Sequence, residues 1–193
     1  PRPDDWPPEC GRLNDHAADD MISLLMTTDT AGGVWHYSLE LCRALQARHG
    51  VAITLAAMGG GAGASDDWPP IDIRMIDRRL EWMPDAASDL EDTGAWLRAI
   101  AREVQPDLIH FNHYTHAAQS WPVPTLVVGH SCILSWWQAV KGEPAPDEWN
   151  RYRDDVRRGV QGAQAVVAPT EAMLRALDRY YGPLPAPCVI PNG

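Results

Sequence analysis

From Met21 onward, short apolar runs alternate with longer stretches in which apolar residues recur every three or four positions. Short apolar runs between turn residues are typical of buried strands, and the longer pattern is typical of helices. The predicted strands are 22–27, 51–57, 71–76, 107–111, 125–129, 165–168 and 188–190, and the predicted helices are 33–48, 88–104, 147–162 and 171–181. This alternation predicts an α/β domain with a Rossmann-like open parallel sheet flanked by helices.

The helical stretches also show which side should face the sheet and where one helix should start. The predicted inward faces are Val34, Tyr37, Leu41 and Leu45 in the first helix and Trp149, Tyr152, Val156 and Val160 in the third. Ser88 followed by Glu91 has the spacing of a capping box, so we expect Ser88 to cap the second helix. The adjacent Trp136 and Trp137 lie in a segment that reads either as a loop or as a short helix.

Composition narrows the class of protein. A chain of 193 residues is long enough for one sizeable domain, which we place at 21–193, after a Pro- and Asp-rich tail at 1–20. The formal charge of -10 argues against nucleic acid and against strong membrane association. We expect a cytoplasmic protein, because no apolar run reaches the roughly 18 residues of a membrane helix, no secretion signal opens the chain, and Cys42 and Cys188 fit reduced, buried thiols.

A parallel sheet binds ligands beyond the carboxyl ends of its strands, and unusual residues gather there. Asp29, Gly32 and Gly33 follow the first strand and precede a helix, whose free N–H groups and positive dipole suit a phosphate or a sugar hydroxyl. A simple tight turn is the plainer alternative. The dinucleotide fingerprint and the phosphate-binding lysine of a P-loop are both absent.

Polar residues also follow the fourth and fifth strands. Asn112 and His113 are candidate acceptor contacts, and His130 with Ser131 enters the same crevice. His130 is the candidate catalytic residue, since an imidazole can bind a substrate hydroxyl or polarise the reacting centre, although a histidine held by nearby backbone would look the same. Ser131 lacks the glycine pattern of a hydrolase nucleophile. We expect no metal site at His110, His113 and His116, since no carboxylate completes a ligand set.

Two further features suit an acceptor. Trp136 could stack on a sugar ring or an apolar acceptor, or could plug the domain. Lys141 lies close by in sequence and could serve an anionic acceptor. The arginine-rich helix at 147–162 also contains Asp154 and Asp155, which favours internal ion pairs on a solvated face.

The order of these segments resembles the N-terminal domain of retaining glycosyltransferases of the GT-B fold, family 4. The resemblance is carried by 25–45 with its double glycine, by 106–110 (PDLIH), by 127–131 (VVGHS), by 163–170 (AQAVVAPT) and by 189–193 (VIPNG). The last of these is similar to the segment that leads into the second domain in that family. The resemblance covers most of the chain after Met21.

The resemblance implies a hexosyltransferase-type enzyme that moves a sugar from a nucleotide-sugar donor to a sugar or small-molecule acceptor, with no metal and no cofactor. It implies that Gly32 and Gly33 approach the donor phosphates and the acceptor, and that His130 contacts the transferred sugar. It also implies that a second, C-terminal domain binds most of the donor, so the isolated domain should be inactive. A GT-B sugar-nucleotide epimerase and a non-catalytic Rossmann-like binding module are the alternatives.

Overall fold

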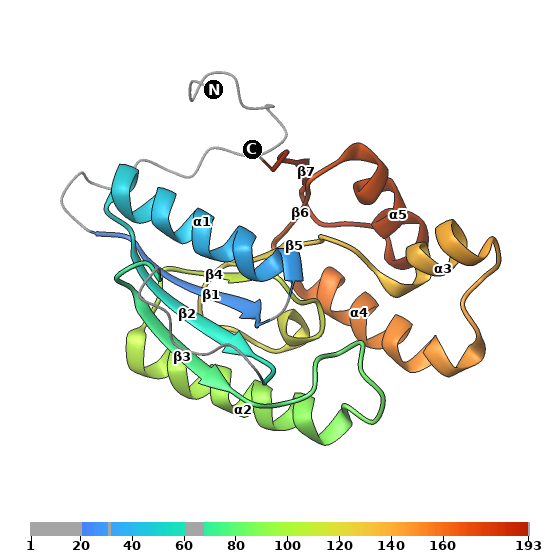
Figure 1. Cartoon of the computed structure of the whole chain (residues 1–193), viewed down its shortest axis with the longest axis horizontal. Helices are drawn as coiled ribbons and strands as arrows, with labels where there is room; N and C mark the ends of the chain where they lie inside the picture. The colour runs from blue at the N-terminus through green and yellow to red at the C-terminus, as the bar shows by residue number, and fades with distance from the viewer. Residues whose placement is uncertain (1–20, 31, 61–67, 193) are drawn as a thin grey trace.

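The computed structural model describes residues 21–30, 32–60 and 68–192, in which seven strands form one parallel sheet (Figure 1). The strands are β1 (Ser23–Asp29), β2 (Ala52–Met58), β3 (Asp72–Ile76), β4 (Leu108–Phe111), β5 (Thr125–Val128), β6 (Ala165–Ala168) and β7 (Pro187–Val189). Their order in the sheet is β3-β2-β1-β4-β5-β6-β7. The predicted tail at 1–20 lies outside the described residues.

Helices connect most of these strands. The α-helices are α1 (Gly32–His49), α2 (Ala87–Val104), α3 (Ile133–Lys141), α4 (Asn150–Gly162) and α5 (Glu171–Tyr181), and the short 3-10 helices are η3 (Thr115–Ala118) and η4 (Asp147–Trp149). The predicted Rossmann-like α/β fold is confirmed. The undecided segment around Trp136 is helical, as α3.

The helices cover both faces of the sheet, as Figure 1 shows for α1 above it and α2 below it. Side chains of α1 pack on Leu24 and Met26 of β1 in one core cluster. A second, larger cluster joins residues of α2, α4 and α5 to the opposite face, including Leu25 of the same strand. Successive residues of β1 therefore serve two cores, because side chains alternate across a strand.

The sheet order places a topological switch point between β1 and β4. From β1 the chain moves to β2 and β3 on one side, and then crosses by α2 to β4 on the other. Met26 of β1 pairs with His110 of β4 in parallel register. Connections that leave in opposite directions open a crevice beyond the strand ends, and ligands of open α/β sheets bind at such points.

The predicted inward face of α1 is confirmed in part, and the predicted cap of α2 is wrong. Leu41 and Leu45 are half-buried and pack against the core cluster of β1, whereas the fully buried residues of α1 are Ser38, Leu39 and Cys42. Val34 and Tyr37 are half-buried as well. The N-cap of α2 is Ala86 rather than Ser88, and no side chain caps that helix. The stripe in α4 is confirmed, with Tyr152, Val156 and Val160 buried.

The cysteines differ from one another. Cys42 and Cys132 are buried free thiols, whereas Cys188 is disulfide-bonded, so the expectation of a reduced thiol at position 188 is wrong. Within the described residues, no helix is both long enough and apolar enough to span a membrane.

Candidate functional site

A cavity of about 190 Å³ lies at the carboxyl ends of the central strands, and we call it the crevice cavity. Its lining residues are Asp29, Val34, Glu81, Trp82, Asn112, His113, Tyr114, His130, Ser131, Cys132, Ile133, Trp136 and Tyr152. The structure thus brings six of the candidate site residues to one place: Asp29, Asn112, His113, His130, Ser131 and Trp136. Residues separated by more than 100 positions in sequence meet here because parallel strands end at the same edge.

Each of these residues owes its position to a strand end or to the helix that follows. Asp29 is the last residue of β1, and Asn112 and His113 come directly after β4. His130 and Ser131 lie between β5 and α3, and Trp136 lies on α3. The Cys132 sulfur accepts from the backbone N–H of Ser135 and so caps α3.

Asn112 is the centre of a buried polar network at the switch point. Its side-chain amide donates to the carbonyl of Thr27 at 2.8 Å and to the hydroxyl of Ser38 at 3.2 Å. The Thr27 carbonyl can only accept, so the atom that faces it is the amide nitrogen. The amide oxygen then faces the Nε2 atoms of His130 at 2.9 Å and of His110 at 3.1 Å. One side chain therefore ties β1, α1, β4 and the loop after β5 together.

The same network defines the protonation of His130. An amide oxygen only accepts hydrogen bonds, so Nε2 of His130 must carry the proton and donate it to Asn112. Burial lowers the pKa of His130 to about 4, so the ring is neutral at physiological pH. Its Nδ1 atom is then an acceptor. The ring of Tyr37 contacts the imidazole edge-to-face, with centroids 4.6 Å apart. His130 can therefore accept a hydrogen bond from a ligand hydroxyl through Nδ1, while its one N–H is held by Asn112.

The other histidines near the switch point are neutral too. Burial lowers the pKa of His110 and His116 to about 4, and that of His113 to about 3. Nδ1 of His113 lies 3.5 Å from the hydroxyl of Thr27, and its Nε2 is buried without a hydrogen-bond partner in the described structure. Among the described residues, no three His, Cys, Asp or Glu side chains gather in a group that could hold a metal.

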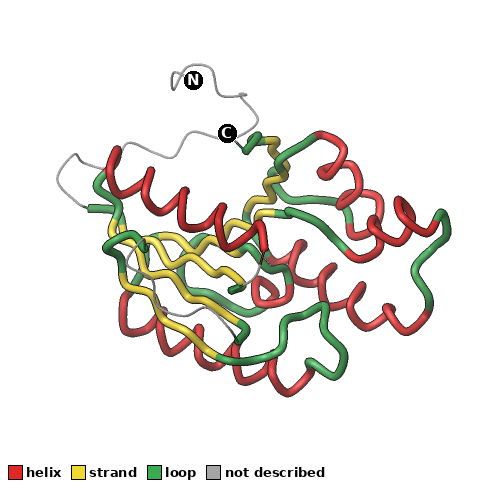
Figure 2. The backbone as a smooth tube through the Cα atoms, viewed as in Figure 1, coloured by secondary structure: helices red, strands yellow, loops and turns green. Residues whose placement is uncertain are grey.

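Glu81 and Trp82 line the crevice cavity although no pattern in the sequence drew attention to them. They lie in the loop between β3 and α2, the long green segment that follows β3 in Figure 2. The half-buried Glu81 carboxylate accepts from the backbone N–H groups of Tyr114, at 3.1 Å, and Thr115, at 2.8 Å. Burial raises the pKa of Glu81, and these backbone donors oppose that shift. The only indication in the sequence is that this loop follows the end of a predicted strand, where ligands of parallel sheets bind.

Three candidate residues lie outside the lining of the crevice cavity. Gly32 and Gly33 are exposed at the start of α1, with Gly32 in the left-handed region at φ 71. They flank the cavity through Val34, which lines it. Lys141, at the end of α3, stands over the rings of Trp136 and Trp137, at 5.9 and 5.8 Å from their centroids.

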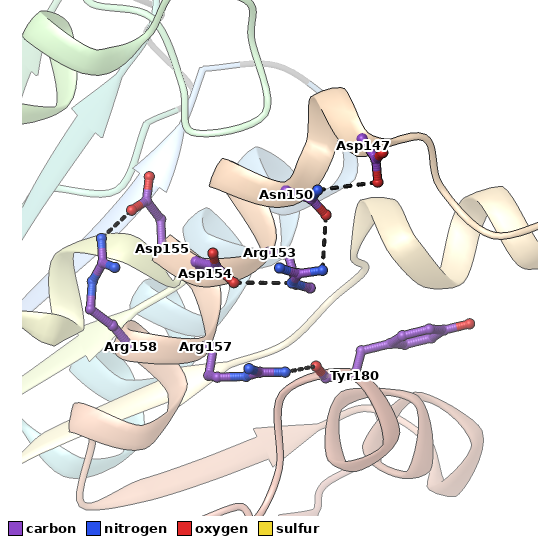
Figure 3. A network of polar contacts seen from close by, with 8 residues as sticks. All are labelled: Asp147, Asn150, Arg153, Asp154, Asp155, Arg157, Arg158 and Tyr180. Carbon is purple, nitrogen blue, oxygen red and sulfur yellow. Dashed lines mark hydrogen bonds and ion pairs between the residues drawn. The ribbon is translucent and has the colours of Figure 1, made fainter.

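The arginine-rich helix α4 forms internal polar contacts (Figure 3). Arg153 contacts Asp154 at 3.0 Å and Asn150 at 2.8 Å, and Arg158 pairs with Asp155. Arg157 donates instead to the carbonyl of Tyr180 on α5 at 3.2 Å. The contacts agree with the prediction of a solvated face whose charges pair within it.

Comparison with protein families decides the class. The model of Glycosyltransferase Family 4 matches residues 31–193. The chain belongs to glycosyltransferase family 4. No curated protein matches this family 4 domain significantly in sequence.

Solved structures agree with the family in fold. Sucrose-phosphate synthase from Thermosynechococcus elongatus superposes with a TM-score of 0.68 at 17% identity, over 89% of this chain and 48% of that one. UGT2 of Phytolacca americana, complexed with UDP-2-fluoro-glucose and pterostilbene, superposes with a TM-score of 0.56 at 13% identity, over 88% of this chain and 53% of that one. The family 4 domain therefore has the architecture of one GT-B half, and it spans about half the length of these proteins.

Proposed function

We propose that this family 4 domain is the N-terminal, acceptor-side half of a retaining glycosyltransferase that uses a nucleotide-sugar donor. The observation that carries the proposal is the convergence of Asp29, Asn112, His130 and Trp136 on one cavity at the switch point. UGT2 of Phytolacca americana was solved with a nucleotide sugar and a small-molecule ligand, which supports this assignment by analogy of fold.

The chemistry of His130 defines its part in the reaction. Its neutral ring, held by Asn112 through Nε2, offers Nδ1 as an acceptor to a hydroxyl of the transferred sugar. The exposed N-terminus of α1 at Gly32 and Gly33 supplies N–H groups and a positive dipole end toward the donor phosphates. Donor and acceptor would then meet between this half and the second domain, where closure excludes water.

The full-length protein tests the proposal. We expect it to release nucleotide from one of a panel of UDP-, GDP- and ADP-sugars when acceptors are supplied, and the product to keep the anomeric configuration of the donor, as read by NMR. His130→Ala should lower the rate by about tenfold, since it removes one hydrogen bond to the transferred sugar, whereas the exposed His49→Ala should not. An epimerised sugar nucleotide without glycosyl transfer, an inverted product, or full activity of His130→Ala would contradict the proposal.

The isolated domain should behave differently. Under the proposal a second domain supplies most of the groups that bind the donor, so we expect no turnover by residues 1–193 with any of the same donors. Sustained transfer by this chain alone would show that the donor site is complete within it.

A further inference from the structure

A larger cavity of about 370 Å³ lies beside the crevice cavity, and we call it the adjoining cavity. It lies where the loop after β3 and the start of α2 meet η4 and the start of α4 (Figure 1). Helices of a parallel α/β sheet run opposite to its strands, so both helix starts lie at the edge where the strands end. No site residue predicted from the sequence is among the described lining residues of this cavity.

Two residues, Glu81 and Tyr152, line both cavities. Tyr152 is buried, and Glu81 is half-buried. The Glu81 side chain is held in place by the backbone N–H groups of Tyr114 and Thr115, at 3.1 Å and 2.8 Å. The two cavities therefore meet at a fixed side chain, and ligands bound in them would come together at Glu81.

The two cavities differ in size. The crevice cavity, at about 190 Å³, is smaller than the roughly 300–1,000 Å³ of sites for drug-sized ligands, whereas the adjoining cavity, at about 370 Å³, falls within that range. Under the proposed function, His130 binds the transferred sugar, so this one ring occupies the crevice cavity. The acceptor then needs a separate space that meets the first, and the adjoining cavity is such a space.

The adjoining cavity combines apolar and hydrogen-bonding side chains. Met83, Leu90 and Trp149 are half-buried in its lining, whereas Asp85 and Glu148 are exposed. These two carboxylates make no ion pair or hydrogen bond to another described residue, so their oxygens can accept from a ligand. A sugar ring presents C–H groups on its faces and hydroxyl groups at its edge, which matches both kinds of side chain.

We propose that the adjoining cavity is the acceptor site and that the acceptor is a sugar of at least two rings, with its reacting hydroxyl at Glu81. The cavity has about twice the volume of the crevice cavity, which holds one ring. Its apolar side chains contact the ring faces, and its carboxylates accept from the hydroxyl groups. This inference rests on the proposed function, which assigns the transferred sugar to the crevice cavity.

Binding to the chain itself tests the site, with no donor and no turnover required. The probes are methyl glucoside, which has one ring, and methyl cellobioside and methyl maltoside, which have two. They are titrated by NMR into protein with isotope-labelled tryptophan, whose indole signals are assigned by tryptophan-to-phenylalanine variants. We expect at least one two-ring probe to bind about fivefold more tightly than methyl glucoside and to shift the signal of Trp149, which lines the adjoining cavity. Trp35, which lines neither cavity, is the internal control.

Matched variants locate the binding. Ala87→Trp should fill the adjoining cavity and abolish binding of the two-ring probe, whereas Ser88→Trp, at the next residue of α2 and outside the lining, should not. Glu148→Ala removes an exposed hydrogen-bond acceptor from the lining and should weaken that probe about threefold. Glu143→Ala removes the same charge from an exposed position outside both cavities and should have no effect. Thermal unfolding checks that each variant is folded, and the exposed Glu148 supplies the test where the larger substitution unfolds the domain.

Four results would overturn the inference: no binding of a two-ring probe, binding no tighter than that of methyl glucoside, shifts of Trp82 and Trp136 in the crevice cavity without a shift of Trp149, or equal binding by Glu148→Ala and Glu143→Ala. Tighter binding of phenyl glucoside than of both two-ring sugars would overturn the assignment of the second ring to a sugar. The proposed function can fail separately. The expected binding without glycosyl transfer by the full-length protein would remove the enzyme and leave the sugar site, whereas transfer that Ala87→Trp leaves unchanged would remove the acceptor site and leave the enzyme.

Discussion

Three buried histidines make the fold sensitive to acid. His110, His113 and His116 are buried, and burial lowers their pKa to about 4, about 3 and about 4. In the unfolded chain each would titrate near its ordinary value of about 6.5. A histidine with a depressed pKa in the folded state contributes stability above the unfolded pKa, and this is lost as the pH falls toward the folded value. We therefore expect stability to fall between about pH 6.5 and pH 4.

The size of the effect follows from the shifts. Between about pH 7.5 and pH 5, protonation of the unfolded state lowers the free energy of unfolding by about 2 kcal/mol per histidine, or about 6 kcal/mol for the three. Domains are stable by roughly 5–15 kcal/mol, so this protein should be close to unfolding at about pH 5. His130, with a pKa lowered to about 4, acts in the same direction. Glu81 acts in the opposite direction, since burial raises its pKa.

A variant isolates the histidine contribution. His113→Leu removes a ring whose Nε2 has no partner in the described structure, so few hydrogen bonds are lost and stability at about pH 7.5 should change by about 1 kcal/mol or less. Between about pH 7.5 and pH 5 this variant should lose about 2 kcal/mol less than the wild type. Urea unfolding followed by tryptophan fluorescence measures both quantities, and His49→Leu, at an exposed position of α1, is the control.

Two outcomes would contradict a set of neutral, buried histidines. If His113→Leu and the wild type lose the same free energy over this pH interval, the ring of His113 is not the neutral, buried group described above. If the wild type loses less than about 2 kcal/mol in total, the histidines as a set are not held neutral by the fold.

Three substitutions probe the network and the glycines. Asn112→Ala should lower the free energy of unfolding by about 2–4 kcal/mol, because the Nε2–H of His110 and the carbonyl of Thr27 lose a buried partner; a loss under about 1 kcal/mol in urea unfolding would contradict this. Gly159→Ala should cost about 3 kcal/mol or more, since its Cβ would stand 1.8 Å from the Tyr114 carbonyl, measured as a fall in Tm. Gly33→Ala meets no atom within 4 Å and should stay within about 1 kcal/mol of the wild type; a cost as large as that of Gly159→Ala would refute the account.

The inner strands of the sheet could be predicted from the sequence because they are buried on both faces. The run at 24–26 and the run at 53–57 consist of apolar residues with one threonine, and both lie on inner strands, β1 and β2, that have a neighbour on each side. A strand covered by helices on both sides is an unbroken run of apolar residues in the sequence. Such a run identifies the strand even when its predicted bounds are wrong by a residue at each end. The crevice could also be predicted, since it requires only that parallel strands end together.

Contacts that depend on side-chain partners distant in sequence could not be predicted. The polar Ser38 is missing from the predicted inward face of α1, although it is buried and its hydroxyl accepts from the side-chain amide of Asn112, 74 positions away. The cap of α3 is Cys132, a residue that is not among the common N-cap types. The close approach of α4 to Tyr114, which Gly159 permits, leaves no periodic signal in the chain.

Burying the polar network around Asn112 costs desolvation free energy, and this cost favours a functional role for the crevice cavity. His110 and Asn112 occupy buried positions at the end of a central strand, where apolar residues of similar size would avoid the cost of desolvation. The hydrogen bonds of Asn112 to His110 and His130 offset much of the free-energy cost of burying these polar groups. They also fix the orientation of the neutral His130 ring, which lines the crevice cavity. Folds depart from apolar patterning mainly where function requires it. Several of the buried polar residues, among them Thr27, His110 and Asn112, lie at the switch point of the sheet, where open α/β sheets bind their ligands. The network holds Nε2–H of His130 on Asn112 and leaves Nδ1 as the acceptor, which is the tautomer that the proposed function requires.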